Sequence, residues 1–123
     1  MKTVLVIEDN ENNMVLITRL LEKYGQRVLQ AETGLKGCEM ALEHQPDYIL
    51  LDIQLPDIDG TEVLKRLRAT EEAVDIKIIA VTSYAMAGDK ARLLAAGCDG
   101  YIEKPINPSR IIEQIESVVG AIS

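Results

Sequence analysis

The most informative stretch of the chain is Tyr48-Ile49-Leu50-Leu51-Asp52, in which a continuous apolar run ends at a single carboxylate. A short run without polar interruption is typical of a strand buried on both faces, as in a parallel sheet. Residues 4–7 and 78–81 have the same character, and branched runs at residues 28–31 and 100–102 complete the set. The sequence therefore predicts five strands, each followed by a longer segment.

Helical patterns fill the intervals between these strands, at residues 11–24, 34–44, 61–69, 86–96 and 108–119. Gly25 is a stop signal for the first helix, and Asp59 with Glu62 forms a capping-box arrangement before the third. Asn107-Pro108 gives the last helix an N-cap and a first-turn proline. The first helix carries an apolar face, made of Met14, Ile17, Leu20, Leu21 and Tyr24.

Five successive βα units imply a doubly wound α/β sandwich with right-handed crossovers. The length of 123 residues is common for a single domain, so one domain is expected over residues 1–123. The formal net charge of −7 argues against nucleic-acid binding, which needs clustered Lys and Arg. No signal peptide or membrane span is expected, and Cys38 and Cys98 read as reduced residues of a cytoplasmic protein.

Side chains capable of chemistry stand where the strands end, and ligands of an open α/β sheet bind beyond those carboxyl ends. In chain order they are Glu8, Asp9, Asp52, Gln54, Thr82, Tyr84, Tyr101 and Lys104. Two carboxylates about 5 Å apart repel by roughly 3 kcal/mol at an effective dielectric constant of about 20, and these loops contain no Arg to relieve that repulsion. Oxygen ligands with an open side suit Mg²⁺, although each acid taken alone could be a solvated helix cap.

The ordered set Glu8-Asp9, Asp52, Thr82, Tyr101 and Lys104-Pro105 resembles the signature of bacterial response-regulator receiver (CheY-like) domains, over essentially the whole chain. Residues 8–14 and 51–56 look particularly like the single-domain regulators of the DivK type, and also like receivers inside hybrid histidine kinases. The resemblance implies a flavodoxin-like (βα)5 sandwich with strand order 2-1-3-4-5. It also implies a single-domain response regulator of a two-component system or phosphorelay, which is a signalling protein and not an enzyme.

By this resemblance Asp52 would be the phosphoacceptor, and Lys104 and the Thr82 hydroxyl would each contact a phosphoryl oxygen. Mg²⁺, or Mn²⁺ as a substitute, would be bound by Asp9, Asp52 and the backbone carbonyl of Gln54, with Glu8 acting through water. Phosphoryl transfer in general requires a positioned nucleophile and neutralised charge on the transferring group.

The resemblance also implies a switch, in which Thr82 moves toward the phosphoryl group and Tyr101 turns inward behind it. Gln54 and Tyr84 would tune the lifetime of the phosphorylated form, and the peptide bond before Pro105 would be cis. The only histidine, His44, stands at a predicted helix end away from the carboxylates. The phosphoryl group would therefore come from a histidine kinase, a histidine phosphotransferase or a small acyl phosphate.

Two surfaces are expected to contact partner proteins, and the protein itself is expected to be a monomer or a weak dimer. The docking face for the donor would consist of Asn12, Asn13, Met14, Ile17, Pro105 and Ile106. The output face would be formed by the fourth helix, the fifth strand and the fifth helix. Residues 86–96 are rich in Ala and Gly, which indicates a loosely anchored fourth helix.

Four other interpretations fit these residues less well. Residues 57–61 spell the D-x-D-G-T signature of haloacid dehalogenase phosphatases, but Pro56 precedes it and the strand has already ended at Asp52. A flavodoxin-like cofactor binder needs a Ser/Thr/Gly-rich loop after the first strand, where this chain is acidic and lacks glycine. A calcium-binding loop at the same place would need a central Gly and a terminal Glu, and both are absent. A phosphate-independent interaction module would usually have lost an acid or the Lys, and none is missing here.

Overall fold

The computed structural model describes residues 1–83 and 87–122, and over this part of the chain five strands alternate with five helices. The strands are β1 (Thr3–Ile7), β2 (Arg27–Ala31), β3 (Tyr48–Asp52), β4 (Lys77–Thr82) and β5 (Gly100–Glu103). The helices are α1 (Glu11–Lys23), α2 (Gly34–His44), α3 (Gly60–Arg68), α4 (Ala87–Ala96) and α5 (Ile111–Val119). All neighbouring strands are parallel, and their order β2-β1-β3-β4-β5 confirms the predicted sheet.

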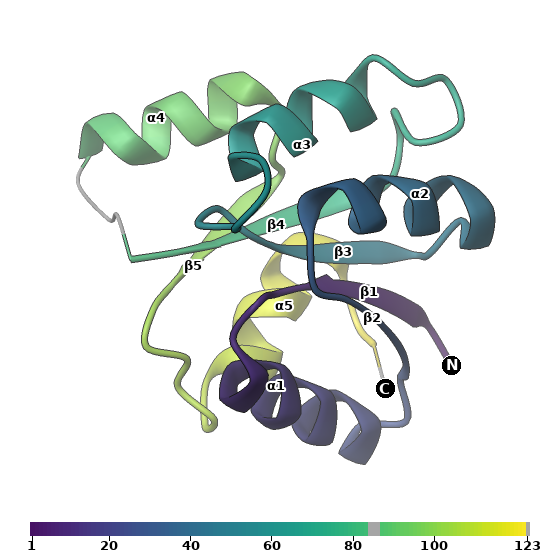
Figure 1. Cartoon of the computed structure of the whole chain (residues 1–123). Helices are drawn as coiled ribbons and strands as arrows, with labels where there is room; N and C mark the ends of the chain where they lie inside the picture. The colour runs from purple at the N-terminus through teal and green to yellow at the C-terminus, as the bar shows by residue number, and fades with distance from the viewer. Residues whose placement is uncertain (84–86, 123) are drawn as a thin grey trace.

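The sheet is the middle of three layers, with α2, α3 and α4 on one face and α1 and α5 on the other (Figure 1). This arrangement follows from parallel pairing, because each connection must cross back over a face of the sheet. The three central strands β1, β3 and β4 are buried along nearly their whole length, as their continuous apolar runs predicted.

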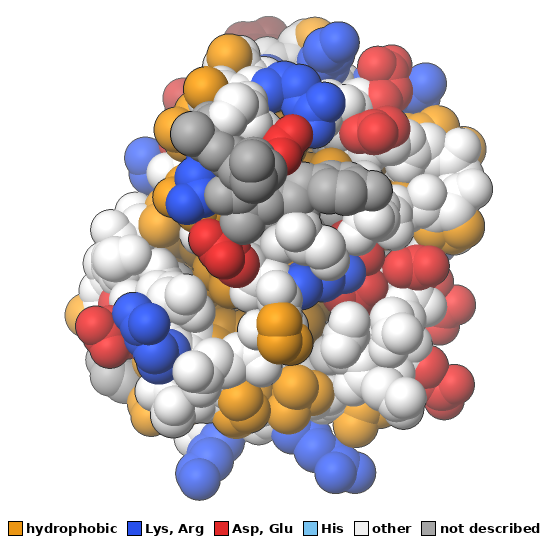
Figure 2. All heavy atoms as spheres, turned by 90° about the vertical axis from the view of Figure 1, so that its left-hand side faces the viewer, with side chains coloured by type: hydrophobic (Ala, Val, Ile, Leu, Met, Phe, Trp, Pro, Cys, Tyr) orange, Lys and Arg blue, Asp and Glu red, His pale blue; other side chains and the backbone are white. Residues whose placement is uncertain are grey.

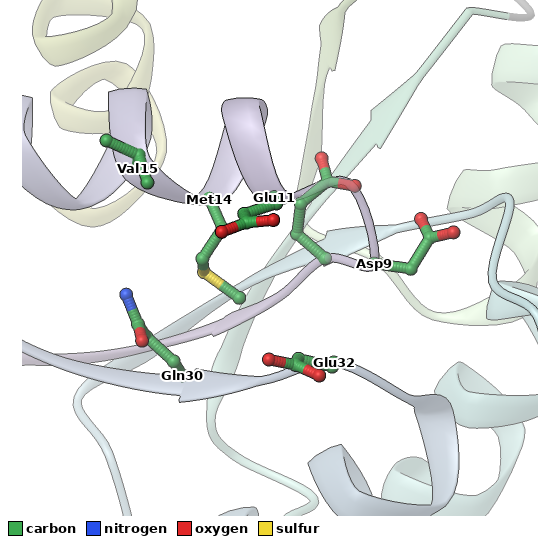
Figure 3. A pocket seen from close by; sticks show the side chains of 7 residues that line it. Asp9, Glu11, Met14, Val15, Gln30 and Glu32 are labelled. Carbon is green, nitrogen blue, oxygen red and sulfur yellow. The ribbon is translucent and has the colours of Figure 1, made fainter.

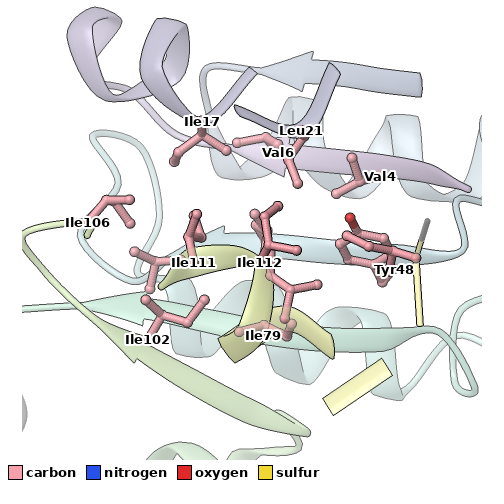
Figure 4. Packing of buried hydrophobic residues seen from close by; sticks show 14 of the residues in the cluster. Val4, Val6, Ile17, Leu21, Tyr48, Ile79, Ile102, Ile106, Ile111 and Ile112 are labelled. Carbon is pink, nitrogen blue, oxygen red and sulfur yellow. The ribbon is translucent and has the colours of Figure 1, made fainter. Parts of the chain in front are cut away.

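Each face of the sheet has its own hydrophobic cluster. The cluster beneath α1 and α5 is built from large side chains (Figure 4), among them Val4, Val6, Ile17, Leu21, Tyr48, Ile79, Ile102, Ile111 and Ile112. The cluster beneath α2, α3 and α4 uses smaller ones as well, since Ala31, Ala41, Ala73 and Ala80 are among its buried members. Of the described side chains of α4, only Leu93 is fully buried, so this helix buries little apolar surface.

A side-chain cap marks the start of helix α1, and a glycine turn follows its end. Asn10 is its N-cap and accepts a hydrogen bond from Asn13 N at 2.9 Å, while Gly25 follows its end with a positive φ of 77°. The prediction that Tyr24 belongs to the helix and shares its apolar face is wrong. Tyr24 is 45% exposed, because the helix ends at Lys23 and Tyr24 is already its C-cap.

The predicted start of the last helix at Pro108 is also wrong, because α5 begins at Ile111. Asn107 Oδ1 accepts hydrogen bonds from Ser109 N at 3.0 Å and from Ser109 Oγ at 2.7 Å. The Asn107 carbonyl accepts from Arg110 N at 3.0 Å. Asn107 therefore organises a tight turn at residues 108–110 that leads into the helix.

Helix α3 is held close to the end of β3 by its first residue. A Cβ on Gly60 would lie 2.5 Å from the Cα of Ile53, so only glycine fits there. Asp59 is the N-cap, as predicted, and accepts from Thr61 N at 2.8 Å. Glu62, expected to complete a capping box, instead pairs with the guanidinium of Arg66 at 3.3 Å.

Two further expectations concern the state of the cysteines and the presence of a membrane span. Cys38 and Cys98 are both free, as predicted. No helix in residues 1–83 and 87–122 combines the length and the apolar character that crossing a bilayer requires.

Candidate functional site

The ends of four strands bring the predicted site residues together at one edge of the sheet. Asp52 is the last residue of β3 and Thr82 the last of β4, whereas Glu8 and Lys104 directly follow β1 and β5. Backbone bonds extend the sheet to this edge, because Glu8 N donates to Ala31 O at 3.0 Å and Lys104 N to Thr82 O at 2.9 Å. Figure 2 views the molecule from this side, with acidic and basic side chains beside one another near the middle of the face.

Three carboxylates meet at this edge of the sheet. Glu8, Asp9 and Asp52 each place an oxygen within 4.8 Å of the other two. Glu8 and Asp52 are only 2% exposed, whereas Asp9 is exposed. Lys104 Nζ lies 3.1 Å from Asp52 Oδ2 and 3.7 Å from Glu8 Oε1. One ammonium group therefore faces two buried carboxylates, and the cluster is net negative when its acids are ionised.

Hydrogen bonds satisfy only half of the buried carboxylate oxygens. Gln54 N donates to Asp52 Oδ1 at 2.9 Å, and Asn10 N donates to Glu8 Oε2 at 3.2 Å. Within the described part of the chain, Asp52 Oδ2 and Glu8 Oε1 accept no hydrogen bond of regular geometry, so their contact with Lys104 is one of charge. Buried polar atoms are nearly always satisfied in proteins, so these two oxygens are suited to a further ligand.

The crowding of charge changes the proton affinity of Glu8. Its pKa is raised from 4.5 to about 7, first by burial, then by the hydrogen bond that protonated Glu8 can donate to Asp52 and by the charge of Asp52, against the opposing effects of the Asn10 N–H and of Lys104. A divalent cation would have the reverse effect on such a carboxylate, because it favours the ionised form.

The donor set at this edge fits a hard divalent cation. Carboxylate oxygens grouped on one side, with the other side open, are the ligands that Mg²⁺ uses together with water and a phosphate. The structure brings Glu8, Asp9 and Asp52 together as the predicted metal site requires. Gln54, whose carbonyl was predicted as a further ligand, follows in an exposed loop and is fixed at its backbone N–H by Asp52.

The two predicted switch residues lie on the same side of neighbouring strands. Ala80 pairs with Tyr101 and Thr82 pairs with Glu103 in the register of β4 and β5, and alternate residues of a strand face the same way. Thr82 is fully buried. The Tyr101 ring is half-buried and packs against the hydrophobic cluster beneath α2, α3 and α4.

Three other predicted positions can be located with respect to the site. The peptide bond between Lys104 and Pro105 is cis, as the resemblance implied. His44 ends α2. Tyr84, expected to tune the lifetime of the phosphorylated form, lies outside the described residues.

A pocket of about 330 Å³ opens beside the carboxylates, between α1 and the end of β2 (Figure 3). Asp9, Glu11 and Glu32 surround it, and Met14 and Gln30 contribute to its lining. It extends the acidic surface from the strand ends toward α1.

The two acids of the D-x-D-G-T segment, Asp57 and Asp59, cap helices in the structure. Asp57 accepts hydrogen bonds from Gly34 N at 2.8 Å and from Leu35 N at 2.9 Å, so it caps α2 from the loop after β3. The bond from Leu35, then that from Gly34, lowers the pKa of Asp57. Asp59 caps α3. Neither stands at a strand end, where a nucleophile of that class would be.

The predicted docking face for the donor is wrong in half of its members. Met14, Ile17 and Ile106 are buried in the cluster beneath α1 and α5, because they form the inward side of α1 and of the turn after β5. On the same surface the exposed residues are Asn12, Pro105 and also Val15, which was not predicted, while Asn13 is half-exposed.

Sequence reasoning also missed contacts that only the fold creates. Lys90 of α4 lies over the ring of Tyr101, with Nζ 4.7 Å from the ring centroid. Arg68, at the end of α3, donates to the carbonyls of Ala73, Val74, Ile76 and Gly97 and pairs with Asp99 at 2.8 Å. Neither residue belongs to a local motif, so no signal in the sequence identified them.

Known proteins share both the sequence and the fold of this chain. The response regulator receiver domain family matches residues 4–116. The polar-differentiation response regulator DivK of Brucella ovis is 47% identical over 119 residues, which is 97% of this chain and 97% of DivK.

Two solved structures extend the comparison. The receiver domain of sensor histidine kinase PA1611 from Pseudomonas aeruginosa PAO1, described with a magnesium ion coordinated in its active site cleft, has a TM-score of 0.88 and 31% identity over 98% of each chain. The chemotaxis response regulator CheY4 of Vibrio cholerae has a TM-score of 0.92 at 24% identity, over 96% of this chain and 98% of its own, and shares the fold. With the family match and the likeness to DivK, these findings show that the chain belongs to the response regulator receiver domains of two-component signalling.

Proposed function

We propose that this protein is a response regulator whose Asp52 accepts a phosphoryl group from a phosphohistidine donor. The observation that carries the proposal is the environment of Asp52, a buried carboxylate at a strand end with Lys104 Nζ 3.1 Å from one oxygen. A carboxylate and an ammonium group placed in this way supply a nucleophile and a charge partner for the incoming phosphoryl oxygens.

In the proposed reaction a carboxylate oxygen of Asp52 attacks phosphorus, and the bond between phosphorus and the donor's nitrogen or oxygen breaks. The electron pair of that bond leaves with the donor, so an acyl phosphate forms on Asp52. The backbone N–H of Gln54 orients the nucleophile through Oδ1, and Lys104 pairs with a phosphoryl oxygen. Mg²⁺, or Mn²⁺ in its place, when bound supplies positive charge that offsets the charge of the transferring group.

Three chain positions would hold that cation: Asp9, Asp52 and the carbonyl of Gln54, with Glu8 acting through water. The buried and unsatisfied oxygens of Asp52 and Glu8 support this assignment. Glu8 also keeps Lys104 beside the site through the contact at 3.7 Å.

The proposed signal is read through Thr82 and Tyr101. The Thr82 hydroxyl donates to a phosphoryl oxygen, and the Tyr101 ring turns inward, which changes the face formed by α4, β5 and α5. Gln54 and Tyr84 tune how fast water removes the phosphoryl group. A downstream protein would bind the changed face.

We also propose that the chain, as one receiver domain over residues 1–123, works as a single-domain regulator, because it matches 97% of the length of DivK at 47% identity. Its donor would be a histidine kinase or a histidine phosphotransferase in the cytoplasm, and the regulator would be a monomer or a weak dimer. Neither nucleic acid nor a membrane is a proposed partner.

The test is incubation with Mg²⁺ and a small acyl phosphate, followed by intact mass spectrometry. The wild-type protein should gain the mass of one phosphoryl group, and Asp52→Asn should gain none. Asp57→Asn is the matched control, because Asp57 is an acid in the same loop that caps α2 and should leave labelling intact. Absence of labelling in the wild type, or equal labelling of Asp52→Asn, would refute the proposal.

A further inference from the structure

The switch side of the sheet contains a cation that the proposed function does not use. Lys90 lies on the first turns of α4, and its Nζ is 4.7 Å from the centroid of the Tyr101 ring. The same ammonium group is 3.4 Å from Glu103 Oε1. One side chain of α4 therefore contacts two residues of β5.

The geometry of β5 explains why one lysine reaches both residues. Tyr101 and Glu103 are two positions apart on the strand, so both side chains face the helical layer that contains α4. Lys90 contacts both residues: its ammonium group forms an ion pair with Glu103 and lies over the ring of Tyr101. The pKa of Lys90 is raised chiefly by Tyr101 and further by Glu103, against partial desolvation.

The neighbouring strand β4 presents a small residue beside Tyr101. Tyr101 pairs in register with Ala80, a residue with a single methyl group, and Ala80 is followed two positions later by Thr82 on the same face. A ring that turned inward would cover Ala80 and approach Thr82. In the structure the ring is half-buried, lies beneath the ammonium group of Lys90 and packs against the cluster beneath α2, α3 and α4.

We propose that Lys90 is a positioning residue for the switch: it ties α4 to β5 and holds the Tyr101 ring away from Thr82. The inward turn breaks the contact between the lysine and the ring, so the tether opposes switching and couples it to the position of α4. The direction of this effect rests on the proposed function of Thr82 and Tyr101. The tether itself rests on the two contacts of Lys90.

The tether is tested first in the protein without any phosphoryl donor, by ¹³C nuclear magnetic resonance of the tyrosine rings. Lys90→Met removes the charge and keeps a long apolar side chain, and it should move the Tyr101 ring resonances. Lys90→Arg should largely restore them, because a guanidinium also packs over an aromatic ring. The matched control is Lys36→Met, which removes an equal charge from an exposed pair with Glu39 on α2. Tyr101 resonances that respond no more to Lys90→Met than to Lys36→Met would overturn the tether.

The effect on switching is tested by the rate at which a small acyl phosphate labels Asp52 in the presence of Mg²⁺. Lys90→Met should raise this rate by about threefold, the population change expected when one cation–π contact at an exposed site is lost. In a Tyr101→Leu background the same substitution should have no effect, because the ring that Lys90 holds is gone. An equal increase in that background would mean that Lys90 acts through its charge on the donor, and the proposal would be wrong.

The two measurements separate this inference from the proposed function. If the wild-type protein takes no phosphoryl group, the proposed function fails, while the ring resonances still decide whether Lys90 holds Tyr101. If labelling occurs and the Tyr101 ring resonances respond no more to Lys90→Met than to the control substitution, the inference fails and the proposed function stands.

Discussion

Glu8→Gln should change how the stability of the metal-free protein depends on pH. The folded protein binds the Glu8 proton more tightly than the unfolded chain, since the pKa is about 7 in the fold against an ordinary 4.5. Folding therefore takes up a proton between these two pH values, and the free energy of unfolding falls as the pH rises through that interval. Below it Glu8 is neutral in both states, and above it the full penalty applies.

The size of this penalty follows from the same two values. Each pKa unit corresponds to about 1.4 kcal/mol, so Glu8 should lower the free energy of unfolding by about 3 kcal/mol at neutral to alkaline pH relative to acid pH. The figure needs no large reduction for solvent screening, because the side chain is only 2% exposed. Glutamine has nearly the same shape and no charge, so the variant should be the more stable protein above pH 7 and about equal to the wild type below pH 4.5.

Urea unfolding followed by circular dichroism, in the presence of a chelator, would measure this difference at several pH values from 4 to 8. Glu22→Gln, at an exposed position of α1, serves as the control for removing one negative charge away from the acidic cluster. Repeating the series with Mg²⁺ should stabilise the wild type most at high pH, where the ionised carboxylates bind the cation best. The reasoning is refuted if the difference between Glu8→Gln and the wild type stays constant across the pH range.

Two paired substitutions test how the fold is held together around the site. Gly60→Ala should lower the free energy of unfolding by about 1–3 kcal/mol, because the new Cβ would meet backbone at 2.5 Å; Gly88→Ala, in helix α4 with nothing within 4 Å of the new Cβ, should raise it by about 0.5 kcal/mol. Arg68→Ala should cost about 2–4 kcal/mol, since it leaves several loop carbonyls without their donor. Arg66→Ala, which breaks one exposed pair with Glu62, should cost less than about 0.5 kcal/mol. Urea midpoints of the four variants decide both comparisons, and equal losses within either pair would contradict the structural explanation.

The strand ends could be predicted from the sequence because a parallel sheet has a strong local signature. Continuous apolar runs end at Glu8, Asp52 and Thr82, and the chain order of five βα units restricts where those ends meet. Proximity of the carboxylates follows from that topology, so the acidic cluster was predictable before any distance was known.

The same local patterns misled where burial depends on a second element. Met14 and Ile17 belong to the apolar face of α1, and a donor-docking surface was also expected from them. The sheet covers both, so they serve the core, while Val15 on the next face of the helix is 41% exposed. The spacing of apolar residues identifies the apolar face of a helix, but it does not show how much of that face the sheet covers.

Contacts made by long charged side chains could not be predicted at all. Lys90 and Arg68 act through groups several bonds from the backbone, and their partners are far away in sequence or in loops without a pattern. The start of α5 was missed for a related reason, because Asn107 can cap either a helix or a turn and the choice depends on how Ser109 bonds to it.

The loop between Asp52 and α3 is closed where its two ends meet and is also anchored at a residue within it. Gly60 N donates to Ile53 O at 2.9 Å, and Asp57 is bonded to the first two residues of α2. A cation or phosphoryl group that enters beside Asp52 therefore meets a backbone whose conformational entropy was already lost during folding. Binding there has little further disorder to remove, so more of the interaction free energy is left to appear as affinity.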